Sequence, residues 1–146
     1  MINCDFCSQQ MSLFEIYIFG LGMPWHFQKG KNSQAKLVSV LEGKVLDIAV
    51  DLRKDSKTFG QHFSIELSQE NKRKLFVPKG FAHGFSVLSE TAIFAYKCDE
   101  YYNKDSEDGI VYNDLDLAID WQIPKDDVII TSKDINLPKF KNAYTF

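Results

Sequence analysis

Apolar and polar residues alternate through the middle of the chain, and this period of two predicts a series of β-strands. Residues 36–52 predict a hairpin that turns at Glu42-Gly43. In its second arm, one face holds Leu46, Ile48, Val50 and Leu52, and the other holds Val45, Asp47, Ala49 and Asp51. Further short strands are predicted at 62–68, 75–78, 84–88 and 91–98. Short strands separated by turns are typical of an antiparallel barrel or sandwich, so we expect an all-β fold.

The two ends of the chain follow this pattern less well. Residues 1–25 form an atypical N-terminal segment, in which the aromatic stretch 11–25 is compatible with one strand. Residues 99–146 are irregular, with a polar loop at 99–109 and a short helical turn predicted within 113–121. We expect the rest of this segment, which contains Pro124 and Pro138, to wrap the barrel as extended chain. The expected organisation is one domain over residues 1–146.

Composition narrows the class of protein. A chain of 146 residues that is 45% hydrophobic and 14% aromatic is not disordered and is long enough to bury a core. A net charge of −3 argues against general nucleic-acid binding. Neither an apolar run of roughly 20 residues nor the basic region of a signal peptide is present, so we expect no membrane association. Three cysteines, an odd number, fit a reducing cytoplasm.

Two histidines are candidates for acid–base chemistry, because this side chain titrates near neutral pH. His83 follows a Pro-Lys-Gly turn that fixes its place at the start of a strand. His26 lies between two aromatic residues, where a histidine is more often a hydrogen-bonded core residue than a catalyst. His62 alternates within a strand and is expected to be structural or at the surface. No His-x-His pair exists, and no second pair follows the Cys4-x-x-Cys7 motif, so no metal site is expected.

Three further residues have both a structural and a functional interpretation. Lys36 opens an apolar strand, where it is either an edge charge or a cation that stabilises an enolate or a phosphate. Tyr96 is either a core residue or an acid, and Asp134 either caps a turn or orients a histidine. Tyr101 follows at the predicted barrel rim, where its ring has the position to stack on a flat base or sugar.

A long run of residues resembles the dTDP-4-dehydrorhamnose 3,5-epimerases, which have a cupin (jelly-roll) fold. The resemblance rests on HFQKGKNSQAKLVSV, on the stretch from GKVLDIAVDL through FVPKGFAHGFSVL to AYKCDEYY, and on NDLDLAIDW and TSKD. It implies an isomerase that inverts C3 and C5 of dTDP-4-dehydro-6-deoxy-D-glucose on the pathway to dTDP-L-rhamnose. It also implies a homodimer that needs no metal and no cofactor.

The resemblance implies a role for each candidate residue. His26 matches the general base, Asp134 the carboxylate paired with it, and Tyr96 the acid on the opposite face of the sugar. The substrate-binding residues that it implies are Lys36, His83, Tyr101, Gln28 and Asp47, with Asp47 supporting His83 and Tyr101 stacking on thymine.

The chain also departs from the family pattern. It reads Met23-Pro24-Trp25-His26 where the family reads Arg-Gly-Leu-His, and the nucleotide-gripping segments that precede the base in the family are missing. We therefore expect an N-terminally truncated or divergent member. The alternatives are an impaired or inactive relative that binds a sugar nucleotide or a protein partner, and an epimerase that acts on a single carbon.

Overall fold

The structure is a computed structural model that describes residues 11–146, without the side chains of 11–16, 18, 21–24 and 125. Cys4 and Cys7 lie outside the described residues. The described chain forms the strands β1 (Met11–Gln28), β2 (Lys36–Glu42), β3 (Lys44–Asp51), β4 (His62–Ser68), β5 (Lys74–Val77), β6 (Phe81–Cys98) and β7 (Glu107–Ile110). Its helical segments are short: η2 (Gly30–Asn32), η3 (Lys104–Ser106), η4 (Lys125–Asp127), α1 (Ser132–Ile135) and η5 (Phe140–Asn142).

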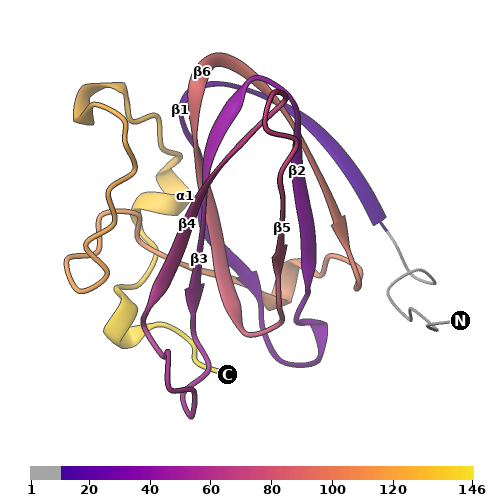
Figure 1. Cartoon of the computed structure of the whole chain (residues 1–146). Helices are drawn as coiled ribbons and strands as arrows, with labels where there is room; N and C mark the ends of the chain where they lie inside the picture. The colour runs from indigo at the N-terminus through magenta and orange to yellow at the C-terminus, as the bar shows by residue number, and fades with distance from the viewer. Residues whose placement is uncertain (1–10) are drawn as a thin grey trace, which may run out of the picture.

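Two long strands, β1 and β6, pair with each other and belong to both walls of an antiparallel barrel. The first half of β6 pairs with β3, and its second half pairs with β2. Figure 1 shows both long strands arching over the closed end of the barrel. The register of β1 against β6 shifts between Ile18 and Gly20 and twice more before His26, which lets the strand bend from one wall to the other. The predicted all-β barrel is confirmed.

Two details of the predicted strands are wrong. Residues 36–52 are not a hairpin, because β2 pairs with β5 and β6, whereas β3 pairs with β4 and β6. The turn at Gly43 instead crosses between the walls and packs so closely that a Cβ there would lie 2.1 Å from the carbonyl oxygen of Thr91. Residues 84–88 and 91–98 are parts of β6 rather than separate strands. Alternation reveals the two faces of a strand but not its partner, which explains the first of these errors.

Hydrophobic residues form two clusters, one on each side of the wall that contains β3. Leu46, Ile48 and Val50 share one face, as the alternation predicted, and they pack outward against the C-terminal segment. Val45 and Phe85 point into the barrel, where the inner cluster fills the closed end. The outer cluster includes Trp25, Phe27, Leu52, Ala82, Ile110, Leu117 and Trp121.

The C-terminal segment, residues 111–146, covers the outside of this wall and is held there by hydrogen bonds (Figure 1). The buried carboxylate of Asp114 accepts from the backbone N–H groups of Leu117 at 3.0 Å and Phe140 at 2.9 Å. Residues 113–121 form turns without a regular helix, and α1, η4 and η5 interrupt the chain that was expected to be extended. No helix in the described residues is long and apolar enough to cross a membrane.

Candidate active site

Polar residues gather inside the barrel at the end opposite the arches of β1 and β6. The loops that surround this open end connect β1 to β2, β3 to β4, β5 to β6, and β6 to β7. His26 on β1 is the cross-strand partner of His83 on β6, so both side chains lie on the same face of the sheet. His83 is in turn opposite Ala49 on β3. The two candidate histidines, 57 positions apart in sequence by their numbers, are therefore neighbours in the barrel mouth.

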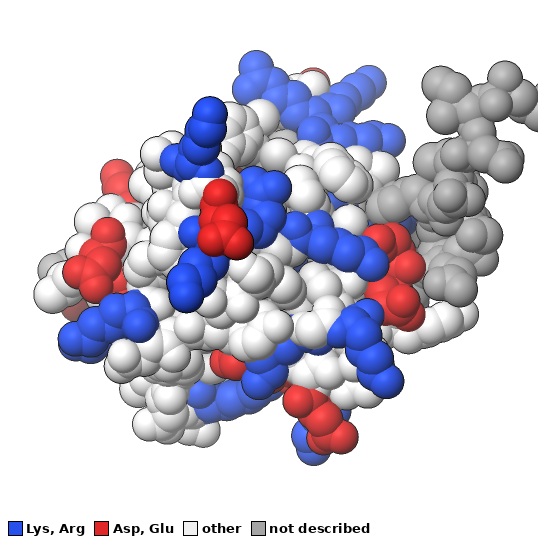
Figure 2. Space-filling model, turned by 90° about the horizontal axis from the view of Figure 1, so that it is seen from below, with Lys and Arg blue, Asp and Glu red and all other residues white. Residues whose placement is uncertain are grey.

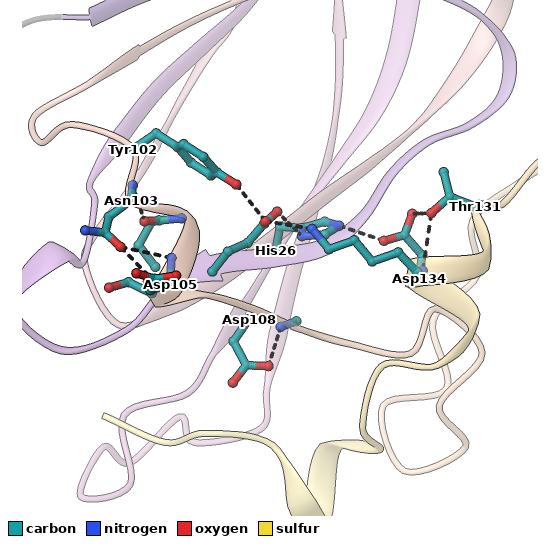
Figure 3. Close-up of polar contacts among 12 residues, drawn as sticks. His26, Tyr102, Asn103, Asp105, Asp108, Thr131 and Asp134 are labelled. Atoms are coloured by element: carbon teal, nitrogen blue, oxygen red, sulfur yellow. Dashed lines mark hydrogen bonds and ion pairs between the residues drawn. The ribbon is translucent and has the colours of Figure 1, made fainter.

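The His26 ring is paired with a carboxylate from the C-terminal segment (Figure 3). Nε2 of His26 lies 3.2 Å from Oδ1 of Asp134. Asp134 is buried in the first turn of α1, where the Thr131 hydroxyl donates to its other oxygen at 2.7 Å. Because that bond fixes the carboxylate, Oδ1 is aimed at the imidazole. The Asp134 carboxylate accepts a hydrogen bond from Nε2–H of the neutral ring. The other nitrogen, Nδ1, then carries the lone pair and is the one available to accept a proton.

A second carboxylate, which the sequence did not reveal, lies beside that remaining nitrogen. Oε1 of Glu107 on β7 is 3.2 Å from Nδ1 of His26. Oε2 of the same residue accepts hydrogen bonds from the Tyr102 hydroxyl at 2.8 Å and from Nζ of Lys133 at 2.6 Å. Glu107 belongs to a four-residue strand, which is too short to show alternation, so its place in the site had no periodic signal.

The charges around His26 act on its protonation in opposite directions. Burial, the largest influence, lowers the pKa of His26 below its ordinary value. Asp134 and Glu107 oppose this effect and raise the pKa, whereas Lys133 and Lys36 lower it further. The net shift is downward, which favours the neutral form of the imidazole at neutral pH.

Lys36 is the cation of the opposite wall. It is partly buried, and it is the cross-strand partner of Cys98 on β6. Burial lowers the pKa of Lys36, while Cys98, Asp47 and Glu107 raise it. Asp47 on β3 and Glu107 on β7 both act electrostatically on Lys36, so its charge is within electrostatic reach of the wall that carries them.

His83 forms a second pair with a carboxylate deeper in the barrel. Its Nε2 lies 2.8 Å from Oδ1 of Asp47, and both side chains are buried. The other oxygen of Asp47 has no hydrogen-bond partner. The His83 ring stacks 6.3 Å from that of Phe94, and the Phe94 ring lies 6.0 Å from that of Tyr96. A continuous row of rings therefore joins His83 to Tyr96, which is partly buried on the wall of Lys36.

Two other predicted site residues lie at the rim. Tyr101 is 63% exposed on the loop after β6. Gln28 is buried, and its side-chain oxygen accepts a hydrogen bond of 2.9 Å from the backbone N–H of Asn103. Gln28 thus anchors the loop that presents Tyr101. His62 is exposed on β4 and outside the site, as predicted.

Comparisons with known proteins show which family the chain belongs to. The family model for dTDP-4-dehydrorhamnose 3,5-epimerase matches residues 17–142. The Salmonella typhimurium dTDP-4-dehydrorhamnose 3,5-epimerase is 48% identical over 121 residues, which cover 81% of this chain and 64% of that protein. The chain spans less than two thirds of the length of this curated relative.

Solved structures share the fold as well as the sequence. The crystal structure of dTDP-4-dehydrorhamnose 3,5-epimerase from Elizabethkingia anophelis superposes with a TM-score of 0.88 at 55% identity, covering 92% of this chain and 74% of that chain. The Legionella pneumophila dTDP-6-deoxy-D-glucose-3,5-epimerase, solved in complex with dTDP-4-keto-L-rhamnose, gives a TM-score of 0.85 at 47% identity, covering 90% of this chain and 69% of that chain. The barrel is a cupin-type jelly roll, and the chain belongs to the dTDP-4-dehydrorhamnose 3,5-epimerase family.

Proposed function

We propose that the protein is a dTDP-4-dehydrorhamnose 3,5-epimerase. In this reaction, C3 and C5 of dTDP-4-dehydro-6-deoxy-D-glucose are inverted by removal of a proton from each carbon next to the C4 ketone. The pairing of His26 with Asp134 at 3.2 Å, in a barrel mouth that also holds the Lys36 charge, carries the proposal. A neutral base beside a cation is what enolate formation requires.

His26 takes the proton through Nδ1 while Asp134 stabilises the imidazolium that forms. Negative charge then develops on the oxygen of the ketone, and Lys36 stabilises it. A positioned general base contributes about 10²–10⁴-fold to such a step. One preorganised charge partner for the oxyanion contributes about 10²–10³-fold. The base and Lys36 are thus of comparable importance.

Inversion requires that a proton returns to the opposite face of the same carbon. Tyr96 serves as this acid. The support is its position on the second half of β6, whereas His26 pairs with the first half of β6. A phenol and an imidazole on facing walls of one barrel have the arrangement that a two-faced proton transfer needs.

The remaining predicted residues bind the substrate. His83, held by Asp47, lies beside the base and donates to the sugar. Tyr101 stacks on thymine from the exposed loop that Gln28 anchors. Figure 2 views the face with the mouth loops, where lysine and arginine side chains are more widespread than carboxylates. A positive rim attracts the anionic diphosphate of a sugar nucleotide.

Exchange with solvent deuterium tests the proposal directly. The protein is incubated with the keto sugar in D₂O, and deuterium at C3 and C5 is counted by NMR or mass spectrometry. Label at both carbons, with the L-rhamno configuration in the product, is the expected result. Label at one carbon identifies a single-carbon epimerase, and binding of dTDP without label identifies an inactive relative. Either result contradicts the proposed double epimerase.

We also propose that the active species is a homodimer. In the described part of the chain, residues 11–18 of β1 pair with β6 on one side only, which leaves an open strand edge. Such an edge is a ready site for pairing with a second chain. Light scattering coupled to size exclusion should give twice the mass of one chain, and a monomeric mass contradicts this proposal. The odd number of cysteines supports the cytoplasm as the location.

A further inference from the structure

Both nitrogens of the base are next to a carboxylate in this structure, although a base needs one nitrogen free. Nε2 of His26 is paired with Asp134 at 3.2 Å. Nδ1 is buried and has no hydrogen bond of acceptable geometry, yet Oε1 of Glu107 lies 3.2 Å from it. Glu107 therefore covers the basic nitrogen without satisfying it. A substrate carbon cannot approach Nδ1 while this carboxylate occupies the space beside it.

The groups that hold Glu107 in this position are themselves close to solvent. Glu107 is 19% exposed, and its partner Lys133 is 60% exposed. The second partner, Tyr102, is 53% exposed. Both bonds are made to Oε2, so Oε1 is left to face the imidazole. A carboxylate with flexible, exposed partners can move aside without disturbing the core.

We propose that Glu107 is a gate on the base, which covers Nδ1 of His26 in the free protein and is displaced when a sugar nucleotide binds. The inference rests on the proposed function, and it assigns Glu107 a positioning role rather than a catalytic one. The sugar needs the space beside Nδ1 that Oε1 of Glu107 occupies at 3.2 Å, so binding of the ligand displaces this carboxylate.

Displacement of Glu107 changes the set of charges that face His26. In the free protein these groups are Asp134 and Lys133 from the C-terminal segment, Glu107 from β7, and Lys36 from β2. His83 is the neighbour on β6. When Glu107 leaves, Asp134 is the only one of these carboxylates still beside the ring. Glu107 should therefore raise the pKa of His26 in the free protein and have no such effect in the complex.

Histidine NMR measures this difference. The pKa of His26 is determined in the wild type and in Glu107→Gln, each free and saturated with dTDP-D-glucose. This ligand has no ketone, so it binds without reacting. A His26→Asn spectrum assigns the resonance, and the chain has only three histidines. The matched control is Glu66→Gln, which removes another glutamate that is paired with a lysine, at 3.5 Å on β4.

The expected result is a lower His26 pKa in free Glu107→Gln than in the free wild type, and equal values in the two complexes. The gate is contradicted if the pKa of His26 still differs between the two complexes, or if it does not differ between the two free proteins. If dTDP-D-glucose perturbs no resonance at saturating concentration, the proposed function fails, and the inference fails with it. Glu66→Gln should match the wild type in both states.

A second variant tests the gate through binding rates and does not depend on the fold of Glu107→Gln. Tyr102→Phe removes one of the two groups that hold Glu107 and keeps the aromatic ring at an exposed position. Stopped-flow measurements should show dTDP-D-glucose associating a few-fold faster than with the wild type. Unchanged or slower association contradicts a gate that must open before binding is complete.

Discussion

His26 and His83 are cross-strand partners, and each is paired with a carboxylate that comes from another part of the chain. Their environments differ. His83 and Asp47 are buried deep in the barrel at 3% and 0% exposure, whereas His26 lies nearer to solvent between Asp134 and Glu107. The more accessible ring is the one placed to exchange protons. The difference in burial therefore predicts a role in proton exchange for His26 rather than for His83.

Replacement of His26 by alanine should lower kcat by about 10²–10⁴-fold, since it removes the proposed general base. Deuterium exchange at C3 and C5 should fall by the same factor, because both depend on the same proton abstraction. The matched control is His62→Ala, which removes an exposed histidine outside the site. Exchange by His26→Ala at the wild-type rate would show that another group is the base.

The acid limb of the pH profile should report the lowered pKa of His26. Because only the neutral ring acts as a base, kcat/KM should stay level as pH falls to about 6.5, the ordinary histidine value, and decline only below it. Asp134 raises this pKa, so Asp134→Asn should move the limb to still lower pH while it reduces the plateau. A limb above pH 6.5, or one that moves upward in Asp134→Asn, would contradict the assignment.

Lys36→Met keeps the length of the side chain and removes its charge. If Lys36 stabilises the enolate oxygen, kcat should fall by about 10²–10³-fold with little change in the thermal midpoint of unfolding. Lys44→Met is the control, because Lys44 forms a half-exposed ion pair with Glu66 near the closed end. Equal kcat values for Lys36→Met and the wild type would contradict this role of Lys36.

Asp51 should be important for stability rather than for catalysis. It is buried at the end of β3 and accepts hydrogen bonds from Arg53 Nη2 at 2.7 Å and from the hydroxyls of Ser56 and Thr58 at 2.6 Å each. Asp51→Ala leaves these donors without their acceptor, so the free energy of unfolding should fall by about 3 kcal/mol in urea titration. Asp55→Ala, at an exposed position of the same loop, should change it by less than about 0.5 kcal/mol.

The same cluster gives stability a defined pH range. Although burial raises the pKa of Asp51, its hydrogen bonds to Arg53, Ser56 and Thr58 lower it more, and the net pKa lies well below the usual range. A depressed carboxyl pKa stabilises the fold at pH values above the unfolded value of about 3.9, and this contribution is lost as pH falls towards the folded value. The difference in stability between wild type and Asp51→Ala should therefore be constant from pH 5 to 7 and shrink in stronger acid.

Local patterns predicted the faces of the strands better than their partners. The alternation of Leu46, Ile48 and Val50 correctly predicted that they share one face of β3, which is the outer face in the structure. It did not show that β2 and β3 lie in opposite walls, because a strand that pairs with a distant segment has the same alternation as one in a hairpin. The continuity of β6 was missed for a related reason. Residues 89 and 90, between the two predicted strands, are both polar and resemble a turn, although they belong to the arch of one strand.

The candidate site shows the same limit. His26 and Asp134 are 108 positions apart, and only the resemblance to a family connected them. Glu107 and Lys133 had no signal at all, because their importance comes from the groups around them in space. Lysine and glutamate in polar loops are ordinary surface residues in most proteins, so a single sequence does not distinguish the few that reach a base.

The two long strands, β1 and β6, each run through both walls of the barrel, so they connect the walls covalently. His83 and Tyr96 are carried by the same strand, on either side of its bend at 88–91. Because side chains alternate with every residue, insertion or deletion of one residue in that bend would turn Tyr96 outward while His83 stayed in place. The mouth loops have no such constraint, so under the proposed function substitutions there are free to change which sugar binds without altering the separation of His83 and Tyr96.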